Sequence, residues 1–94
     1  MRLTPDQTRI IKDTIHRVLD PNAQVWLFGS RIDENRRGGD VDLYVETDRP
    51  RLLAELQCKA NLEEALDLHV DLVIRQPERD HPIYSIAKAE GIPL

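Results

Sequence analysis

The chain has 94 residues, of which 40% are apolar and 32% charged, and its formal net charge is −4. This length fits a single domain, residues 1–94, with one modest core. The acidic balance argues against a general nucleic-acid-binding protein, which would carry a basic surface. It does not exclude a nucleotide substrate, because a metal ion can supply positive charge locally.

Targeting features are missing from the sequence. No apolar run approaches the ~20 residues of a membrane span, and the first residues lead straight into a helix pattern rather than a signal peptide. The single cysteine, Cys58, excludes an internal disulfide, fits a reducing cytosol, and is expected to pack along a helix. Three scattered histidines give no zinc-ligand spacing. We therefore expect a cytoplasmic protein that has no membrane contact.

The first predicted element is a capped helix. Thr4 can cap it, Pro5 suits its first position, and Gln7 can complete a capping box. Its apolar stripe at helical spacing consists of Ile11, Ile15, Val18 and Leu19. The Asp-Pro-Asn sequence at residues 20–22 ends the helix, and an apolar strand is predicted over about residues 24–28.

A short helical turn over residues 30–33 and a charged loop over 35–39 are predicted next. The two glycines of that loop let it bend into a second strand, residues 41–45. A second helix is predicted from Pro50 to about Leu66. The residues expected on its buried side are Leu52, Leu53, Leu56, Ala60 and Leu66.

A third strand, residues 68–74, a polar loop over 76–80 and a last helix over 82–90 complete the chain, with Gly91 as the C-cap of that helix. The order predicts an α/β domain with a small mixed sheet of three or more strands flanked by helices. The helix between the second and third strands could make them a parallel pair, but the pattern does not give the strand order.

The most informative residues lie where the first two strands meet. Gly29 and Ser30 end the first strand, and Asp40 and Asp42 begin the second. Residues two apart in a strand point the same way, so Asp40 and Asp42 share one face. Two carboxylates facing a glycine turn suit a divalent metal that carries a phosphate. The alternative interpretation is a polar turn before a strand.

Asp71 is a lone charge in the middle of the apolar third strand. Such a charge is costly unless it is paired or metal-bound. Asp71 can join Asp40 and Asp42 if the third strand lies beside the second. The alternative is a half-exposed strand position or an ion-pair partner.

These motifs resemble the DNA polymerase beta-like nucleotidyltransferase superfamily, and in particular its minimal nucleotidyltransferase (MNT) group. The matching segments are Leu-Phe-Gly-Ser-Arg at 27–31, Asp-Val-Asp-Leu at 40–43, Val-Asp-Leu-Val at 70–73 and the tail at 90–94. The resemblance implies the polymerase beta-like fold, and two metal ions held by three aspartates. It also implies NTP binding by the Gly-Ser turn and transfer of a nucleoside monophosphate.

Carried onto this chain, the resemblance makes Asp40, Asp42 and Asp71 the catalytic and metal-binding residues, with Mg²⁺ as the metal and ATP as the substrate. Two metals can activate the nucleophile, neutralise the pentavalent centre and stabilise the leaving pyrophosphate. Asp40 and Asp42 would bridge or divide the metals, and Asp71 would serve the metal nearer the nucleophile and could take its proton.

The phosphates would lie on the Gly-Ser turn. Gly29 lets the backbone come close because no Cβ intervenes, and the Ser30 hydroxyl can bond a phosphate oxygen. Arg31 could add a charge-assisted contact, and a surface ion pair is its equally good alternative. For Arg36 and Arg37 in the charged loop, a solvated charge run is favoured over contact with the triphosphate or a partner.

The short chain leaves no room for an acceptor-binding domain, so the acceptor should come from a partner or be very small. MNT-type proteins are typically encoded with a HEPN-domain protein. The resemblance implies a hetero-oligomer in which this chain is the antitoxin and transfers AMP to a tyrosine of a HEPN ribonuclease toxin, or neutralises it by binding alone. A small-molecule, antibiotic-type nucleotidyltransferase is the third hypothesis. Candidate partner contacts are Ile83, Tyr84 and Ile86, and burial in the core is the favoured alternative for at least two of them.

Overall fold

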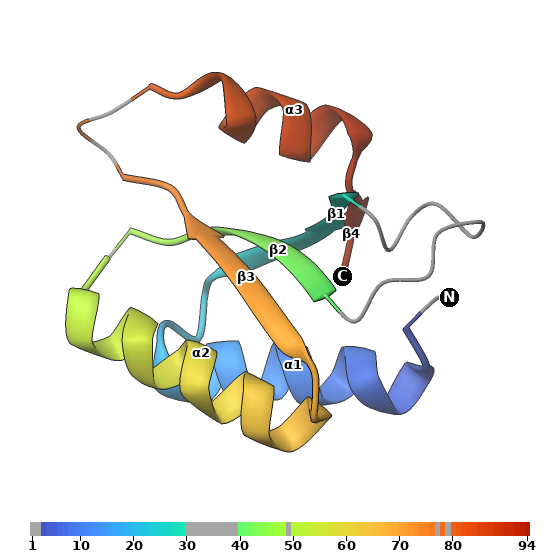
Figure 1. Ribbon diagram of the computed structural model, residues 1–94. Coiled ribbons are helices and arrows are strands. Elements are labelled where there is room, and N and C mark those ends of the chain that lie inside the picture. The colour runs from blue at the N-terminus through green and yellow to red at the C-terminus, as the bar shows by residue number, and fades with distance from the viewer. Residues whose placement is uncertain (1–2, 30–39, 49, 77, 79) are drawn as a thin grey trace.

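The computed structural model describes residues 3–29, 40–48, 50–76, 78 and 80–94, and the side chain of Asp40 lies outside the described part. The described elements, in chain order, are α1 (Pro5–Val18), β1 (Gln24–Phe28), β2 (Asp40–Glu46), α2 (Leu52–Leu66), β3 (His69–Ile74), α3 (Pro82–Glu90) and β4 (Ile92–Pro93). Figure 1 shows the sheet between two helical layers, with α1 and α2 on one face and α3 on the other.

The sheet is mixed and has the strand order β3-β2-β1-β4. β2 is antiparallel to β1 and parallel to β3, and α2 provides the crossover between the parallel strands. The predicted small mixed α/β sheet is therefore confirmed. The two-residue strand β4, which pairs with Trp26 and Leu27, was not predicted, because a dipeptide containing proline carries no strand signal.

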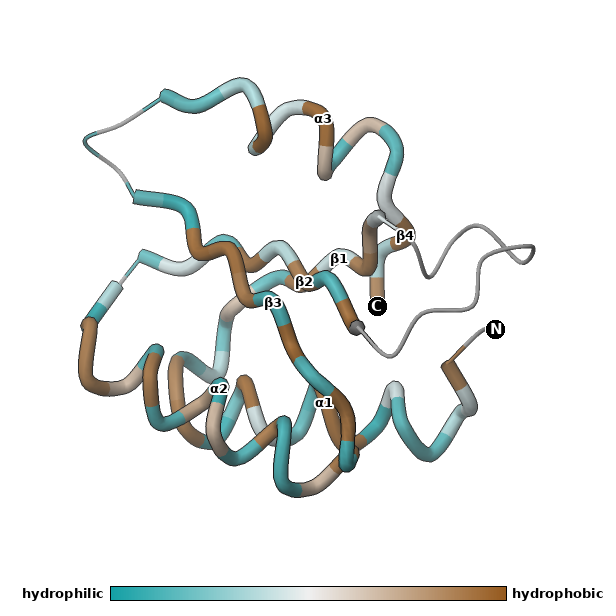
Figure 2. The backbone as a smooth tube through the Cα atoms, viewed as in Figure 1, coloured by the Kyte–Doolittle hydropathy of each residue, from teal (hydrophilic) through white to brown (hydrophobic). Residues whose placement is uncertain are grey.

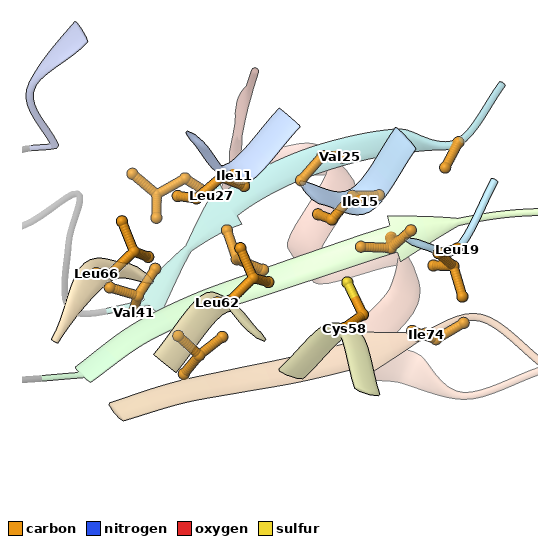
Figure 3. Packing of buried hydrophobic residues seen from close by; sticks show 14 residues of the cluster. Ile11, Ile15, Leu19, Val25, Leu27, Val41, Cys58, Leu62, Leu66 and Ile74 are labelled. Atoms are coloured by element: carbon orange, nitrogen blue, oxygen red, sulfur yellow. The ribbon is translucent and has the colours of Figure 1, made fainter. Parts of the chain in front are cut away.

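The main core lies between the sheet and the layer of α1 and α2 (Figure 3). β2 alternates: Val41, Leu43 and Val45 are buried in this core, whereas Tyr44 faces the α3 side with Trp26. The residues labelled in the core view are Ile11, Ile15, Leu19, Val25, Leu27, Val41, Cys58, Leu62, Leu66 and Ile74. Cys58 is fully buried among them, as expected for a packing residue.

The N-terminal helix begins as predicted. The backbone N–H of Gln7 donates to the Thr4 hydroxyl at 3.0 Å, and the N–H of Thr4 donates to Oε1 of Gln7 at 2.9 Å. This reciprocal capping box satisfies backbone donors that the first helical turn leaves without partners. The helix ends before the buried carboxylate of Asp20, which accepts from the N–H of Asn22 and from the Thr47 hydroxyl.

The predicted buried side of α2 is wrong at four of its five positions. Leu52, Leu53 and Leu56 are 69%, 81% and 56% exposed, and Ala60 is also exposed. The buried residues are instead Cys58, Leu62 and Leu66, spaced by four along one face. Apolar residues lie on several sides of this helix, so periodicity does not select the face; Figure 2 shows that even the start of α2 is hydrophobic.

The last helix packs on the sheet through aromatic rings. The ring of Tyr84 stacks on that of Tyr44 with centroids 5.6 Å apart, and Ala87 is fully buried beside Trp26. Ile83 and Tyr84 are partly buried and Ile86 is 48% exposed, so Ile86 remains the most accessible of the predicted contact residues. Over the described residues, none of the helices has the length and apolarity needed to cross a bilayer.

Gly91 is the C-cap of α3, as predicted, but not because of a left-handed backbone. Its φ is −79°, a value open to every residue. A Cβ at this position would overlap the carbonyl oxygen of Ala87 and lie 3.0 Å from that of Leu27. Glycine is therefore required by the close approach of the chain to the last turn of α3 and, less severely, to β1.

Candidate functional site

Gly29 lies at the end of β1 and has a φ of +77°, in the left-handed region. A Cβ at this position would overlap Oδ2 of Asp42 and lie 3.0 Å from its Cγ. The antiparallel register explains this contact, because Phe28 pairs with Asp42 across β1 and β2. The glycine therefore makes space for a carboxylate, a role that the sequence did not reveal.

The parallel pairing of β2 and β3 brings two of the predicted aspartates together. Asp42 and Asp71 are directly in register, so their side chains leave the sheet on the same face, with strands ~4.8 Å apart. Asp42 is partly buried, and the side chain of Asp71 is 50% exposed. Asp40 is the first residue of β2, two positions from Asp42, and its backbone is in register with His69.

Beyond Asp42, the face that carries these carboxylates becomes aromatic at Tyr44. From Tyr44 onward α3 covers it, with the ring of Trp26 5.4 Å from that of Tyr44. Burial and a hydrogen bond from its hydroxyl to Glu46 raise the pKa of Tyr44, so this buried phenol stays neutral. The same alternation that puts Tyr44 under α3 places the Asp42 carboxylate near the strand start, beside Gly29.

Asp71 has a histidine partner that sequence reasoning overlooked. Nε2 of His69 lies 3.2 Å from Oδ1 of Asp71, and Nδ1 of the same ring lies 3.0 Å from Oε2 of Glu63. Asp71 is thus both half-exposed and paired, which matches the alternative interpretation of this residue and leaves its predicted role open. The signal was available, since His69 and Asp71 are two apart on one strand and must share a face.

Several predicted residues lie outside the described part of the structure. Ser30, Arg31, Arg36 and Arg37 belong to residues 30–39, and the side chain of Asp40 is likewise outside it. Among the described side chains, no group of three or more His, Cys, Asp and Glu residues is arranged to hold a metal ion. The donor chemistry nevertheless fits Mg²⁺: Asp42 and Asp71 carry carboxylate oxygens on neighbouring strands, and the absence of a side chain at Gly29 leaves room for the Asp42 carboxylate.

A surface pocket of about 490 Å³ lies near the other end of β2. It includes Glu46, which is four residues along the strand from Asp42, and Arg75. The described site residues Gly29, Asp42 and Asp71 are not among those that line it. Within the described part of the chain, its lining consists of Asn22, Gln24, Glu46, Thr47, Asp48 and Arg75. The pocket is a hollow between strand ends and adds nothing to the carboxylate site.

Solved structures similar to this chain include two toxin–antitoxin complexes. A chain of the MntA–HpeT complex, crystallised as a tyrosine-to-alanine mutant, matches with a TM-score of 0.69 and 21% identity over 97% of this chain and 71% of that one. A chain of the complex between a tri-AMPylated Shewanella oneidensis HEPN toxin and its MNT antitoxin matches with a TM-score of 0.61 and 22% identity, over 90% and 69% respectively. At these identities the likeness concerns the fold.

The sequence comparisons agree with the geometry. No curated protein matches the chain. Residues 8–94, nearly the whole sequence, match the nucleotidyltransferase domain family. That segment contains Gly29, Asp42 and Asp71, the three predicted site residues whose surroundings the structure describes. With a mixed sheet that sets two carboxylates in register beside a glycine turn, and a family match over almost its full length, the chain belongs to the nucleotidyltransferase domain family.

Proposed function

We propose that this protein is a Mg²⁺-dependent nucleotidyltransferase that transfers AMP from ATP to a tyrosine of a HEPN-domain ribonuclease toxin, and so acts as its antitoxin. The observation that carries the proposal is the register of Asp42 and Asp71 on parallel strands, with the Asp42 carboxylate packed against Gly29. A domain that only covered its partner would have no use for adjacent carboxylates at a glycine turn.

The transfer step is a displacement at phosphorus. The tyrosine oxygen forms a bond to the α-phosphorus of ATP, the bond from that phosphorus to the bridging oxygen breaks, and pyrophosphate leaves. Asp71 accepts the proton of the tyrosine hydroxyl; because its side chain is half-exposed, a hydroxyl from another protein can reach it. Asp40 and Asp42 would hold the metal ion, and Gly29 and Ser30 would receive the triphosphate. Bound Mg²⁺ would supply the positive charge that the phosphates and pyrophosphate require.

The choice of partner draws support from the structural neighbours. One is a complex of an MNT antitoxin with a tri-AMPylated HEPN toxin, and the other is a toxin–antitoxin complex carrying a tyrosine mutation. The net charge of −4 adds an independent argument. An acidic protein is electrostatically suited to a basic, RNA-binding partner, and AMP added near the ribonuclease site would place a phosphate where RNA phosphate should bind.

The test is a transfer assay with the co-encoded HEPN protein. The two proteins are incubated with labelled ATP and Mg²⁺, and the partner is followed by intact mass and by RNA cleavage. We expect mass gains in increments of AMP together with loss of cleavage. A partner that is inhibited without gaining mass would indicate neutralisation by binding alone. A partner that neither binds nor gains mass would exclude the antitoxin function and favour a small-molecule acceptor.

A further inference from the structure

His69 stands between two carboxylates at the start of β3. Its Nε2 is 3.2 Å from Oδ1 of Asp71, which lies two residues along the same strand, and its Nδ1 is 3.0 Å from Oε2 of Glu63 on α2. Nε2 forms a hydrogen bond with Asp71, and Nδ1 is in close contact with the Glu63 carboxylate. The three side chains form one continuous chain of contacts from the helix to the predicted site.

Glu63 is held in place by the strand itself. The same Oε2 that faces His69 accepts the backbone N–H of Val70 at 3.0 Å. That N–H belongs to an edge strand, since β3 is the outermost strand of the sheet. The same oxygen of Glu63 therefore accepts the backbone N–H of the edge strand and contacts the histidine ring. These two contacts fix the ring relative to the backbone of β3.

We propose that His69, anchored by Glu63, is a positioning residue that holds Asp71 in the orientation needed to bind metal. This inference rests on the proposed function of Asp71 at the same site. A half-exposed aspartate on an edge strand is otherwise able to sample several rotamers. Contact with His69 engages Oδ1 and orients the carboxylate, whose second oxygen can serve a cation. A ligand oriented in advance loses less conformational freedom when metal binds.

The position of the ring supports a role at this site rather than elsewhere. His69 is the β3 residue paired with Asp40, just as Asp71 is paired with Asp42. The ring therefore belongs to the same face and the same strand ends as the carboxylates. A histidine that served only to hold Glu63 at the edge of the sheet would need its contact with Glu63, but not its contact with Asp71.

The proposal is tested by measuring metal affinity in the full-length protein. Calorimetric titration with Mn²⁺, alone and with α,β-methylene ATP, is compared among wild type, His69→Ala and His69→Gln. We expect His69→Ala to weaken Mn²⁺ binding roughly tenfold, as for other residues that orient metal ligands. His69→Gln should retain affinity within about threefold, because its amide N–H can still donate to Asp71. In transfer assays the His69→Ala defect should disappear at saturating Mn²⁺, whereas that of Asp71→Asn should persist.

Arg75→Ala is the matched control, since Arg75 directly follows β3, is about as exposed as His69, and also contacts a carboxylate, that of Glu46. It should leave Mn²⁺ affinity unchanged. Unchanged or tighter Mn²⁺ binding in folded His69→Ala would overturn the positioning role while leaving the transferase function standing. If wild type binds Mn²⁺ in a His69-dependent manner but transfers no AMP, the positioning role is supported and the proposed function fails.

Discussion

Asp42 is the residue on which the site depends most directly, because it contacts the glycine turn and neighbours Asp71. Asp42→Asn keeps the shape of the side chain and removes its charge, so we expect AMP transfer to fall by at least about a hundredfold, the scale of one lost electrostatic contribution to catalysis. The fold should be kept, as judged by circular dichroism and the unfolding midpoint. Wild-type transfer rates in a folded Asp42→Asn protein would show that the site has been misassigned.

Cys58 gives a prediction about pH. Burial raises the pKa of its thiol from 9.0 to about 11, against a smaller lowering by Arg17. The unfolded thiol ionises first, so the stability that this group contributes is complete below pH 9 and is lost as pH rises towards 11. Urea unfolding at pH 7 and pH 10 should therefore show a larger loss of stability in wild type than in Cys58→Ala. Equal losses in the two proteins would contradict the assignment.

For single residues, the sequence indicates which ones form the site better than it indicates what surrounds them. The spacing of Gly29, Asp40 and Asp42 was readable because strand alternation alone puts the two carboxylates on one face. The contact between Gly29 and Asp42 was not readable, since it depends on the register of β1 against β2. The pairing of Asp71 with His69 could have been predicted from strand alternation alone, but it was overlooked. The contact between Glu63 and that histidine could not be predicted, because it depends on how the α2 crossover packs against β3.

Among the elements, α2 shows most clearly where sequence periodicity fails. Its boundaries were predicted to within two residues of Leu52–Leu66, but its buried face was not. Leucines outnumber the positions that the sheet can cover, so packing against α1 and β3, and not spacing, selects Leu62 and Leu66 over Leu52, Leu53 and Leu56. The capped start of α1 was readable because a capping box is a local pattern.

A matched pair of leucine substitutions tests this face. Leu62→Ala should lower the free energy of unfolding by about 2–5 kcal/mol, because Leu62 is fully buried and its loss leaves a cavity. Leu53→Ala should change it by no more than about 0.5 kcal/mol, since Leu53 is 81% exposed. Urea denaturation followed by circular dichroism measures both values. Comparable losses for the two variants would mean that α2 presents a different face to the sheet.

At the scale of the whole molecule, the acidic charge leads to a kinetic prediction about the complex. With a net charge of −4, association with the proposed HEPN partner should be accelerated by electrostatic attraction to a basic RNA-binding surface. The association rate constant, measured by surface plasmon resonance, should fall as salt rises from 50 to about 500 mM, while dissociation changes less. A rate constant that does not respond to salt would indicate that charge plays no part in recognition.

The contact between Gly29 and Asp42 has a consequence for how this fold tolerates change. Any side chain at position 29 must displace the carboxylate at position 42, in addition to adopting a positive φ. If Asp42 were first reduced to glycine, only the backbone penalty would remain, so the costs of the two substitutions would not add. The two positions are thermodynamically coupled across the β1–β2 pair, and a lineage that lost the carboxylate would keep only the part of the glycine requirement that comes from the positive φ.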